Sequence, residues 1–245
     1  MPAPGAPIDV RARATTCAPP RCKTVGATVE LAWQPPSGGG SIDGYVVIRD
    51  GSEVTQAGEV GPGETSWVDE SATPSLEYTY QVVTVGPGGR SDPSEDVRVK
   101  LPKPPLSAAR FEGFFNVHLV VTRATFLGQL EGIEDPKPGD KKTDTWSFLA
   151  TCRRGRGECP TEWGFGGTLR PRGTIYTGTF QGPSPSNCGG GDHAPEHITM
   201  RLRVTMAAMD GEWKVSRFEG DYTVSFACSS FASIGTFHVT GTALG

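Results

Sequence analysis

The residues of this chain whose chemistry is easiest to assign are its six cysteines. Fifteen pairings of six cysteines are possible in principle. Proximity in the sequence suggests the pairs Cys17–Cys22 and Cys152–Cys159, which leaves Cys188–Cys228. An even number of cysteines, two close pairs and the lack of a Cys-x-x-Cys spacing favour an oxidising compartment. We therefore expect an exported protein whose cysteines form disulfides.

A second group of residues has the chemistry of a binding site. Arg153, Arg154 and Arg156 crowd the short segment between Cys152 and Cys159. Three guanidinium groups in one loop could contact an anionic wall polymer or an acidic partner, although a solvated turn is the simpler reading. Tyr176 could stack on a sugar ring if its side chain is exposed. We take these four residues as the candidate binding residues.

The sequence gives little support for catalysis or metal binding. His193 and His197 have the spacing of zinc ligands on a helix, but Pro195 lies between them and favours a surface loop. The acidic residues of the segment 128–142 lack the Asp-x-Asp-x-Asp-Gly pattern of a calcium loop, and lysines are interleaved with them. No Gly-x-Ser-x-Gly segment occurs. We expect no catalytic residue, no metal, no cofactor and no enzymatic activity.

Bulk composition narrows the classes of partner. The 245 residues suffice for two domains, and a net charge of −4 argues against nucleic acid as a partner. No run of 18 apolar residues occurs, so we expect no membrane insertion by this segment. The 33 glycines and 21 prolines stand between alternating apolar runs, which indicates turn-rich β structure. The excess of arginine over lysine is typical of a bacterial gene rich in GC.

The strands that must position these residues fall into two domains, which meet at Leu101-Pro102-Lys103-Pro104-Pro105. Three prolines in five residues support neither a helix nor a sheet ladder and favour a short, stiff spacer. We therefore predict an all-β chain with a first domain at residues 1–101, a linker at 102–106 and a second domain at 107–245.

Short strands with turn signals between them fill the first domain, as in a β-sandwich. Its motifs include Leu31-x-Trp33-x-Pro35-Pro36, Gly44-Tyr45-x-Val47 and Glu77-Tyr78-x-Tyr80-x-Val82. With these motifs, residues 5–101 resemble a fibronectin type III domain. The resemblance implies that Trp33 packs between two sheets, that Tyr78 forms a corner hydrogen bond, and that the domain is a spacer or docking module. Some family members carry Arg-Gly-Asp where this chain reads Gly89-Arg90-Ser91-Asp92, so cell binding by that tripeptide is not implied.

Strict alternation of apolar and polar residues marks the second domain, most clearly in Ile198-Thr-Met200-Arg-Leu202-Arg-Val204. Seven or eight antiparallel strands in a meander are expected, closed into a barrel or packed as a sandwich. Trp163 and Trp213 are in phase with apolar neighbours and should lie in the core. With its Thr-Cys strands and terminal Val239-Thr-Gly-Thr, this half loosely resembles uncharacterised β-rich ectodomains of exported actinobacterial proteins. The meander also resembles lipocalin or avidin-type barrels.

These patterns favour a non-enzymatic binding or adhesion ectodomain, extracellular or anchored to the cell surface. The first domain would be a spacer and the second a recognition unit for a protein or glycan at the cell surface. Two alternatives stay open at this point. One is a barrel that carries a small ligand, and the other is a carbohydrate-binding accessory module of a secreted enzyme.

Overall fold

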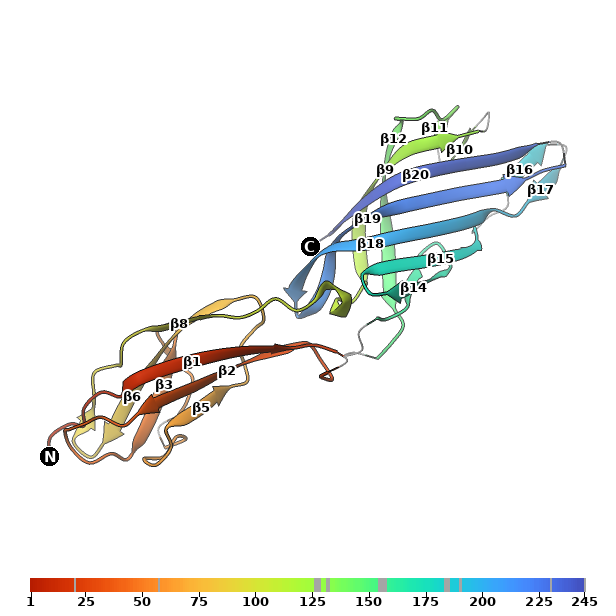
Figure 1. Ribbon diagram of the computed structural model, residues 1–245. Coiled ribbons are helices and arrows are strands. Elements are labelled where there is room, and N and C mark those ends of the chain that lie inside the picture. The colour runs from red at the N-terminus through yellow and green to blue at the C-terminus, as the bar shows by residue number, and fades with distance from the viewer. Residues whose placement is uncertain are drawn as a thin grey trace. The chain divides into compact units, whose positions relative to one another are not determined.

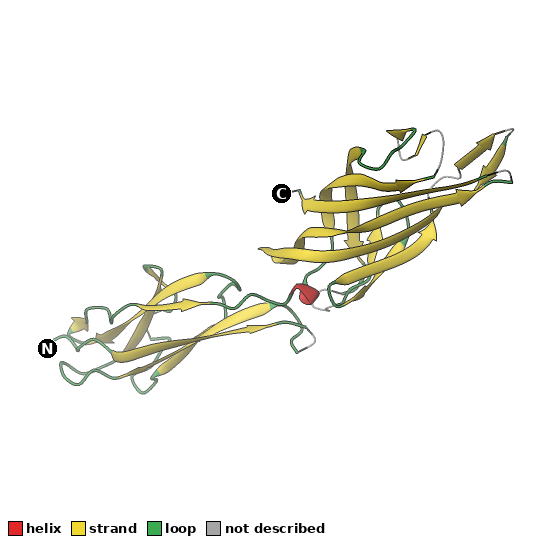
Figure 2. Cartoon of the chain, turned by 45° about the horizontal axis from the view of Figure 1, so that its top comes forward, coloured by secondary structure: helices red, strands yellow, loops and turns green. Residues whose placement is uncertain are grey.

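The computed structural model describes residues 1–244 apart from 20, 57, 126–128, 131–132, 154–157, 183–185, 190 and 230. The chain is all-β and forms two compact units, one of residues 1–17 and 25–104 and one of residues 18–24 and 105–245 (Figure 1). One short 3-10 helix, η1 (Leu106–Ala108), interrupts the strands (Figure 2). In the described part of the chain, no helix has the length and apolar character needed to cross a membrane.

The first unit is a sandwich of two sheets. One sheet has the order β1-β2-β5, and the other has the order β4-β3-β6-β7 with β8 also paired to β6. The strands are β1 (Ile8–Cys17), β2 (Gly26–Gln34), β3 (Gly44–Arg49), β4 (Ser52–Glu53), β5 (Ser66–Asp69), β6 (Glu77–Gly86), β7 (Gly89–Arg90) and β8 (Val97–Lys100). Asp50 and Gly51 join β3 to β4 with positive φ at both positions, as a two-residue hairpin turn requires.

The core of the sandwich confirms the two packing expectations. Trp33 is buried and meets Tyr45 edge to face, with ring centroids 5.3 Å apart. The Tyr78 hydroxyl accepts a hydrogen bond of 3.0 Å from the Thr73 amide, which is the expected corner bond. Both side chains therefore stabilise the sandwich rather than bind a partner.

A buried carboxylate, Asp69, links the two sheets of the sandwich. Tyr80 donates to its Oδ2 at 2.7 Å, Arg49 at 2.6 Å, and the amide and hydroxyl of Ser71 donate to its Oδ1. Burial opposes the charge, but hydrogen bonds from Ser71, Tyr80 and Arg49 outweigh it and lower the pKa of Asp69. Asp69 is therefore ionised in the folded domain at neutral pH.

The second unit is a closed antiparallel barrel with the strand order β12-β13-β14-β15-β18-β19-β20-β9, and β9 pairs with β12 to close it. Its strands are β9 (Gly113–Ala124), β12 (Lys141–Ala150), β13 (Thr161–Trp163), β14 (Thr168–Arg172), β15 (Ile175–Gln181), β18 (His197–Asp210), β19 (Glu212–Ala227) and β20 (Ala232–Ala243). Two small hairpins extend from it, β10 (Gln129–Leu130) with β11 (Ile133–Glu134) and β16 (Ser186–Gly189) with β17 (Asp192–Ala194). Of the two expected arrangements, the barrel is the one observed.

Aromatic side chains fill the barrel near η1. Phe111 is fully buried, and its ring centroid lies 4.4 Å from that of Phe148 and 5.2 Å from that of Phe218. Gly241 of β20 faces Phe218 so closely that a Cβ there would lie 2.1 Å from the ring, so only glycine leaves room. Trp163 and Trp213 are buried as expected. This half of the barrel is therefore a packed core.

Two disulfides brace the barrel. Cys152 bonds to Cys159 and Cys188 bonds to Cys228, the pairing suggested by proximity. Cys17 and Cys22 are disulfide-bonded as well. On the chain-entropy account, the loops closed by the two barrel bridges contribute about 2 and about 4 kcal/mol of stability respectively.

Candidate functional site

The outer wall of the barrel is polar and arranged in cross-strand rows. Thr179, Thr199, Thr223 and Thr236 are direct neighbours on β15, β18, β19 and β20. The hydroxyls of Thr223 and Thr236 are 3.3 Å apart. In the next rows, Arg203 forms an ion pair with Glu219, and the His238 ring lies 3.7 Å from the Asp221 carboxylate. Because these groups bind one another, this part of the wall is an ordinary solvated surface.

The outer wall carries exposed apolar side chains at the end where β20, β9 and β12 are neighbours. Phe114 of β9 is 63% exposed, Leu149 of β12 is 61% exposed, and Leu244 after β20 is 52% exposed. The Leu244 amide donates to the Phe114 carbonyl at 2.9 Å, and Phe114 is the cross-strand neighbour of Ser147, two residues before Leu149. We call Phe114, Leu149 and Leu244 the apolar patch. Adjacent exposed side chains of this size are typical of interaction surfaces.

The arginine-rich loop follows β12, the strand that carries Leu149 of the apolar patch. Arg153 is exposed and follows Leu149 by four residues, at the start of the loop that the Cys152–Cys159 disulfide closes. Arg154 and Arg156 lie outside the described residues. The sequence of this loop carries three arginines and one glutamate, Glu158. In the sequence, a positively charged segment therefore follows the exposed Leu149 closely.

Several contacts fix the base of this loop. The amide and hydroxyl of Thr151 both donate to the Pro160 carbonyl, at 2.9 and 3.1 Å. The buried Thr161 hydroxyl donates to the Phe111 carbonyl at 2.6 Å. At the other side, Glu158 accepts a hydrogen bond of 3.0 Å from the Gly173 amide. The loop is thus anchored at both ends to the barrel.

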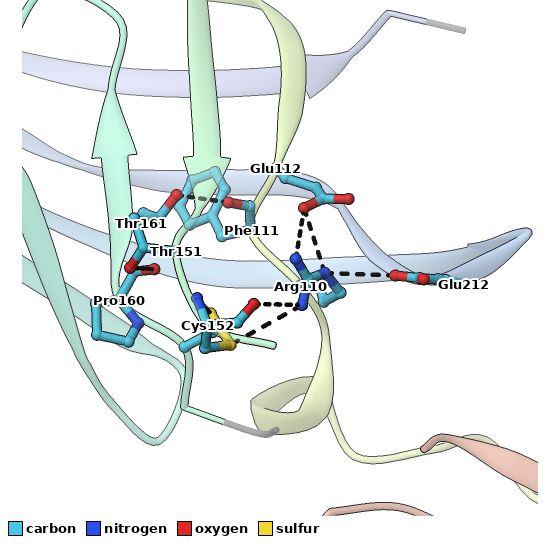
Figure 3. Close-up of a disulfide and its surroundings, with 9 residues drawn as sticks. Arg110, Phe111, Glu112, Thr151, Cys152, Pro160, Thr161 and Glu212 are labelled. Carbon is cyan, nitrogen blue, oxygen red and sulfur yellow. Dashed lines mark hydrogen bonds and ion pairs between the residues drawn. A yellow bond between two sulfur atoms is a disulfide. The ribbon is translucent and has the colours of Figure 1, made fainter. Parts of the chain in front are cut away.

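Arg110 also contacts the base of the arginine-rich loop, as Figure 3 shows. Its guanidinium lies 2.8 Å from Glu112 and 3.4 Å from Glu212, and it donates to the Cys152 carbonyl at 3.5 Å. The side chain is largely buried and its charge is shared by two carboxylates. Arg110 therefore helps to fix the base of the loop, and its charge is engaged by Glu112 and Glu212.

The hypothesis that Tyr176 is an exposed sugar platform is wrong. Tyr176 is 1% exposed, because it pairs with Leu202 on the inward face of β15 and its ring meets Phe111 edge to face at 5.0 Å. Burial, together with the negative charge of Glu158, raises the pKa of Tyr176 to about 12. Tyr176 is a core residue beneath the arginine-rich loop.

The other polar groups singled out in the sequence do not converge on one site. His193 lies in β17 and His197 begins β18, and both are exposed. Asp140 accepts a hydrogen bond from the Lys137 amide within its own turn. Glu131 lies outside the described residues. Among the residues that the structure describes, no group of three or more His, Cys, Asp or Glu side chains is arranged to hold a metal ion.

A comparison with protein families matches residues 20–100 to the Fibronectin type III domain. This match falls on the sandwich with the Trp33 core and the Tyr78 corner. Residues 20–100 form a fibronectin type III domain. A search of curated proteins finds no match to the chain.

Arg90 of the fibronectin type III domain forms its ion pair with a residue of the same domain. Arg90 forms an ion pair with Glu53, joining the β6–β7 hairpin to β4. The arginine of the segment Gly89-Arg90-Ser91-Asp92 therefore contacts another residue of the same domain.

Sequence reasoning missed the apolar patch, although a signal for it was present. Phe114-Phe115 and Phe148-Leu149 are apolar pairs inside alternating strands, so one member of each pair must face outward. Phe165, two residues after the buried Trp163, is nevertheless 44% exposed. The reason is that β13 ends at Trp163 and a turn follows.

Proposed function

We propose that this chain is a non-enzymatic extracellular binding protein whose recognition surface is the apolar patch together with the arginine-rich loop. The observation that carries the proposal is the exposure of Phe114, Leu149 and Leu244 at one end of three neighbouring strands. The disulfides and the fibronectin type III domain support an extracellular location. Anchoring to a cell surface belongs to the same proposal.

The chemistry of the surface defines the partner class. Apolar side chains are buried favourably only against another apolar surface, and the adjacent arginines favour an anionic one. The partner is therefore an acidic protein or glycan surface with an apolar component, exposed on a cell. Charge would speed the encounter and the apolar contact would hold the complex.

The test is to measure binding of the full chain to a panel of cell-surface proteins and polysaccharides. Phe114→Ser and Leu149→Ser should each weaken binding to the same panel member by about tenfold, since each removes about 1.4 kcal/mol or more of apolar contact. Arg153→Ser should weaken the same binding and make it less sensitive to salt. Thr240→Ser, on the polar wall, is the matched control and should change nothing.

Two results would count against the proposal. Hydrolysis of any panel member by the purified chain would show an enzyme. Binding that survives both Phe114→Ser and Leu149→Ser would place recognition elsewhere on the chain.

A second candidate function, small-ligand binding, is favoured by a separate pocket. The pocket has a volume of about 410 Å³ and lies among the ends of β18, β19 and β20 beyond the aromatic core. Phe226, Ile234, Ala227 and Pro195 give it an apolar lining, with His197 and Ser225 as polar groups. A fluorescent apolar probe that binds the wild type and is lost in Ala227→Trp, which would fill the pocket, is the expected result for this function.

A further inference from the structure

The sandwich of the first unit has an opening between two of its strands, β1 and β8. β1 is at the edge of one sheet, and β8 pairs only with β6 in the other. The two strands lie side by side (Figure 1). No backbone ladder joins them in the described part of this domain. The seam between the sheets therefore has two strand edges facing each other.

The seam is closed at one end and open at the other. At the closed end, the Thr16 hydroxyl donates to the Pro102 carbonyl at 2.8 Å. At the open end lies a cleft of about 500 Å³, lined by residues 7–11 on one side and 94–97 on the other. Five residues of extended chain span about 17 Å, so the cleft has the length of a short extended peptide.

The first strand is distorted at the cleft. Asp9 has φ of +52°, a left-handed conformation that is uncommon for residues other than glycine. The register between β1 and β2 shifts between Ile8 and Arg11, and Ile8 is left 42% exposed. Bulges of this kind re-aim side chains and end strand pairing. The cleft therefore has an apolar side chain at its mouth and the edge of β1 along one wall, while residues 94–96, which precede β8, form the other.

The rim of the cleft is acidic. Asp9, Glu95 and Asp96 line it with exposed carboxylates, and Arg11 is the cation among the lining residues. Three negative charges and one positive charge give the rim a net charge of −2. Such a rim favours a basic occupant.

We propose that this cleft binds an extended basic segment of another protein by strand addition. The segment would lie along the open edge of β1, with main-chain hydrogen bonds to it and lysine or arginine side chains beside Asp9, Glu95 and Asp96. One aliphatic side chain would cover Ile8. This role is independent of the proposed function of the barrel, because it involves only residues of the first unit.

The test uses the full chain and a peptide of about six residues in which lysine and valine alternate, with both ends blocked. NMR titration should show shifts in the amides of residues 7–11 and 94–97. The same peptide methylated on alternate backbone nitrogens keeps its charges but loses its donors, so it should not bind. A glutamate–valine peptide should not bind either.

The variants separate the cleft from general charge effects. Glu95→Lys with Asp96→Lys should weaken binding of the lysine–valine peptide by about tenfold, since exposed charge pairs contribute roughly 0.5–1 kcal/mol each. Asp92→Lys is the matched control, because Asp92 is exposed on the same segment but does not line the cleft. It should leave the affinity within about twofold.

Three outcomes would overturn the proposal, and each is distinct. If the peptide does not bind, the cleft is an ordinary sandwich edge. If the methylated peptide binds as well as the unmodified one, the contact is electrostatic and involves no added strand. If Asp92→Lys weakens binding as much as the cleft variant does, only the overall charge of the domain matters.

Discussion

The barrel and the sandwich differ in whether their sheets end in unpaired edge strands. The barrel ladder runs through eight strands and closes on itself, so it has no end strand, although the short β13 covers only Phe148–Ala150 of β12. The sandwich leaves β1 and β8 facing each other without a ladder between them. Most strand edges of the barrel are paired, so it offers a partner mainly side chains, whereas the sandwich can also offer the backbone of an edge strand. The two regions are therefore suited to different kinds of partner.

The two regions also differ in what holds them together. In the barrel, Phe111 is packed among Phe115, Phe148, Tyr176 and Phe218, and disulfides brace the loops. In the sandwich, a buried charge on Asp69 accepts hydrogen bonds from three side chains. Aromatic packing is insensitive to pH, but an ionised carboxylate is not. Substitutions in one region should therefore leave the other intact.

The largest effect is expected in the barrel core. Phe111→Ala should destabilise the barrel by about 4 kcal/mol, because it removes a fully buried ring and leaves a cavity. Hydrogen exchange of the full chain should show faster exchange in the barrel strands and no change in β1–β8. Phe114→Ala is the control, since its exposed ring should contribute under about 0.5 kcal/mol. Equal loss of protection in both units would contradict their independence.

A somewhat smaller effect is expected in the sandwich. Asp69→Asn should cost about 3 kcal/mol, because it leaves Arg49 without its buried partner. The lowered pKa of Asp69 means that its contribution is complete at neutral pH and is lost as pH falls through the folded-state pKa, below about 4. Urea unfolding of the wild type and Asp69→Asn should therefore converge at low pH. A constant difference across pH would show that the charge of Asp69 is unimportant.

The loop disulfide should matter less for stability than for binding. Replacing Cys152 and Cys159 by serine together should lower barrel stability by about 2 kcal/mol on the entropy account. The same double variant should weaken partner binding at the apolar patch, because the arginine-rich loop loses its anchor. Thermal unfolding and the binding panel measure the two effects separately. Unchanged binding would remove the loop from the recognition surface.

The smallest effect is expected at the corner of the sandwich. Tyr78→Phe removes one hydrogen bond, from the Thr73 amide, and should cost about 1 kcal/mol. Urea titration of the full chain measures this loss in the transition of the sandwich. Tyr45→Phe is a useful control, because in the described structure the buried Tyr45 hydroxyl makes no hydrogen bond of regular geometry and has only the Trp33 side chain as a polar neighbour. A larger loss for Tyr45→Phe than for Tyr78→Phe would be the opposite of the expected order.

The sequence predicted those features that depend on local pattern. Trp33 and Tyr78 were recognisable from their neighbours, and Cys152 and Cys159 from their proximity. The closure of the barrel was left open, because alternation shows which side chains point inward but not that β20 pairs with β9, more than a hundred residues earlier. Tyr176 could not be placed, because the strand around it mixes threonine and glycine with few apolar residues.

The candidate binding surfaces were harder to predict for a related reason. The apolar patch combines Phe114, Leu149 and Leu244, which are distant in the sequence and meet only through strand pairing. The cleft between β1 and β8 depends on the conformation of Asp9, and no sequence pattern of the chain indicates a left-handed aspartate inside a strand.

One NMR titration of the full chain tests the difference between open and closed strand edges most directly. The lysine–valine peptide and its backbone-methylated analogue are added in turn while all amides are followed. The account predicts shifts confined to residues 7–11 and 94–97 with the unmodified peptide, and no shifts with the analogue. Shifts spread over the barrel strands, or the same response to both peptides, would contradict it.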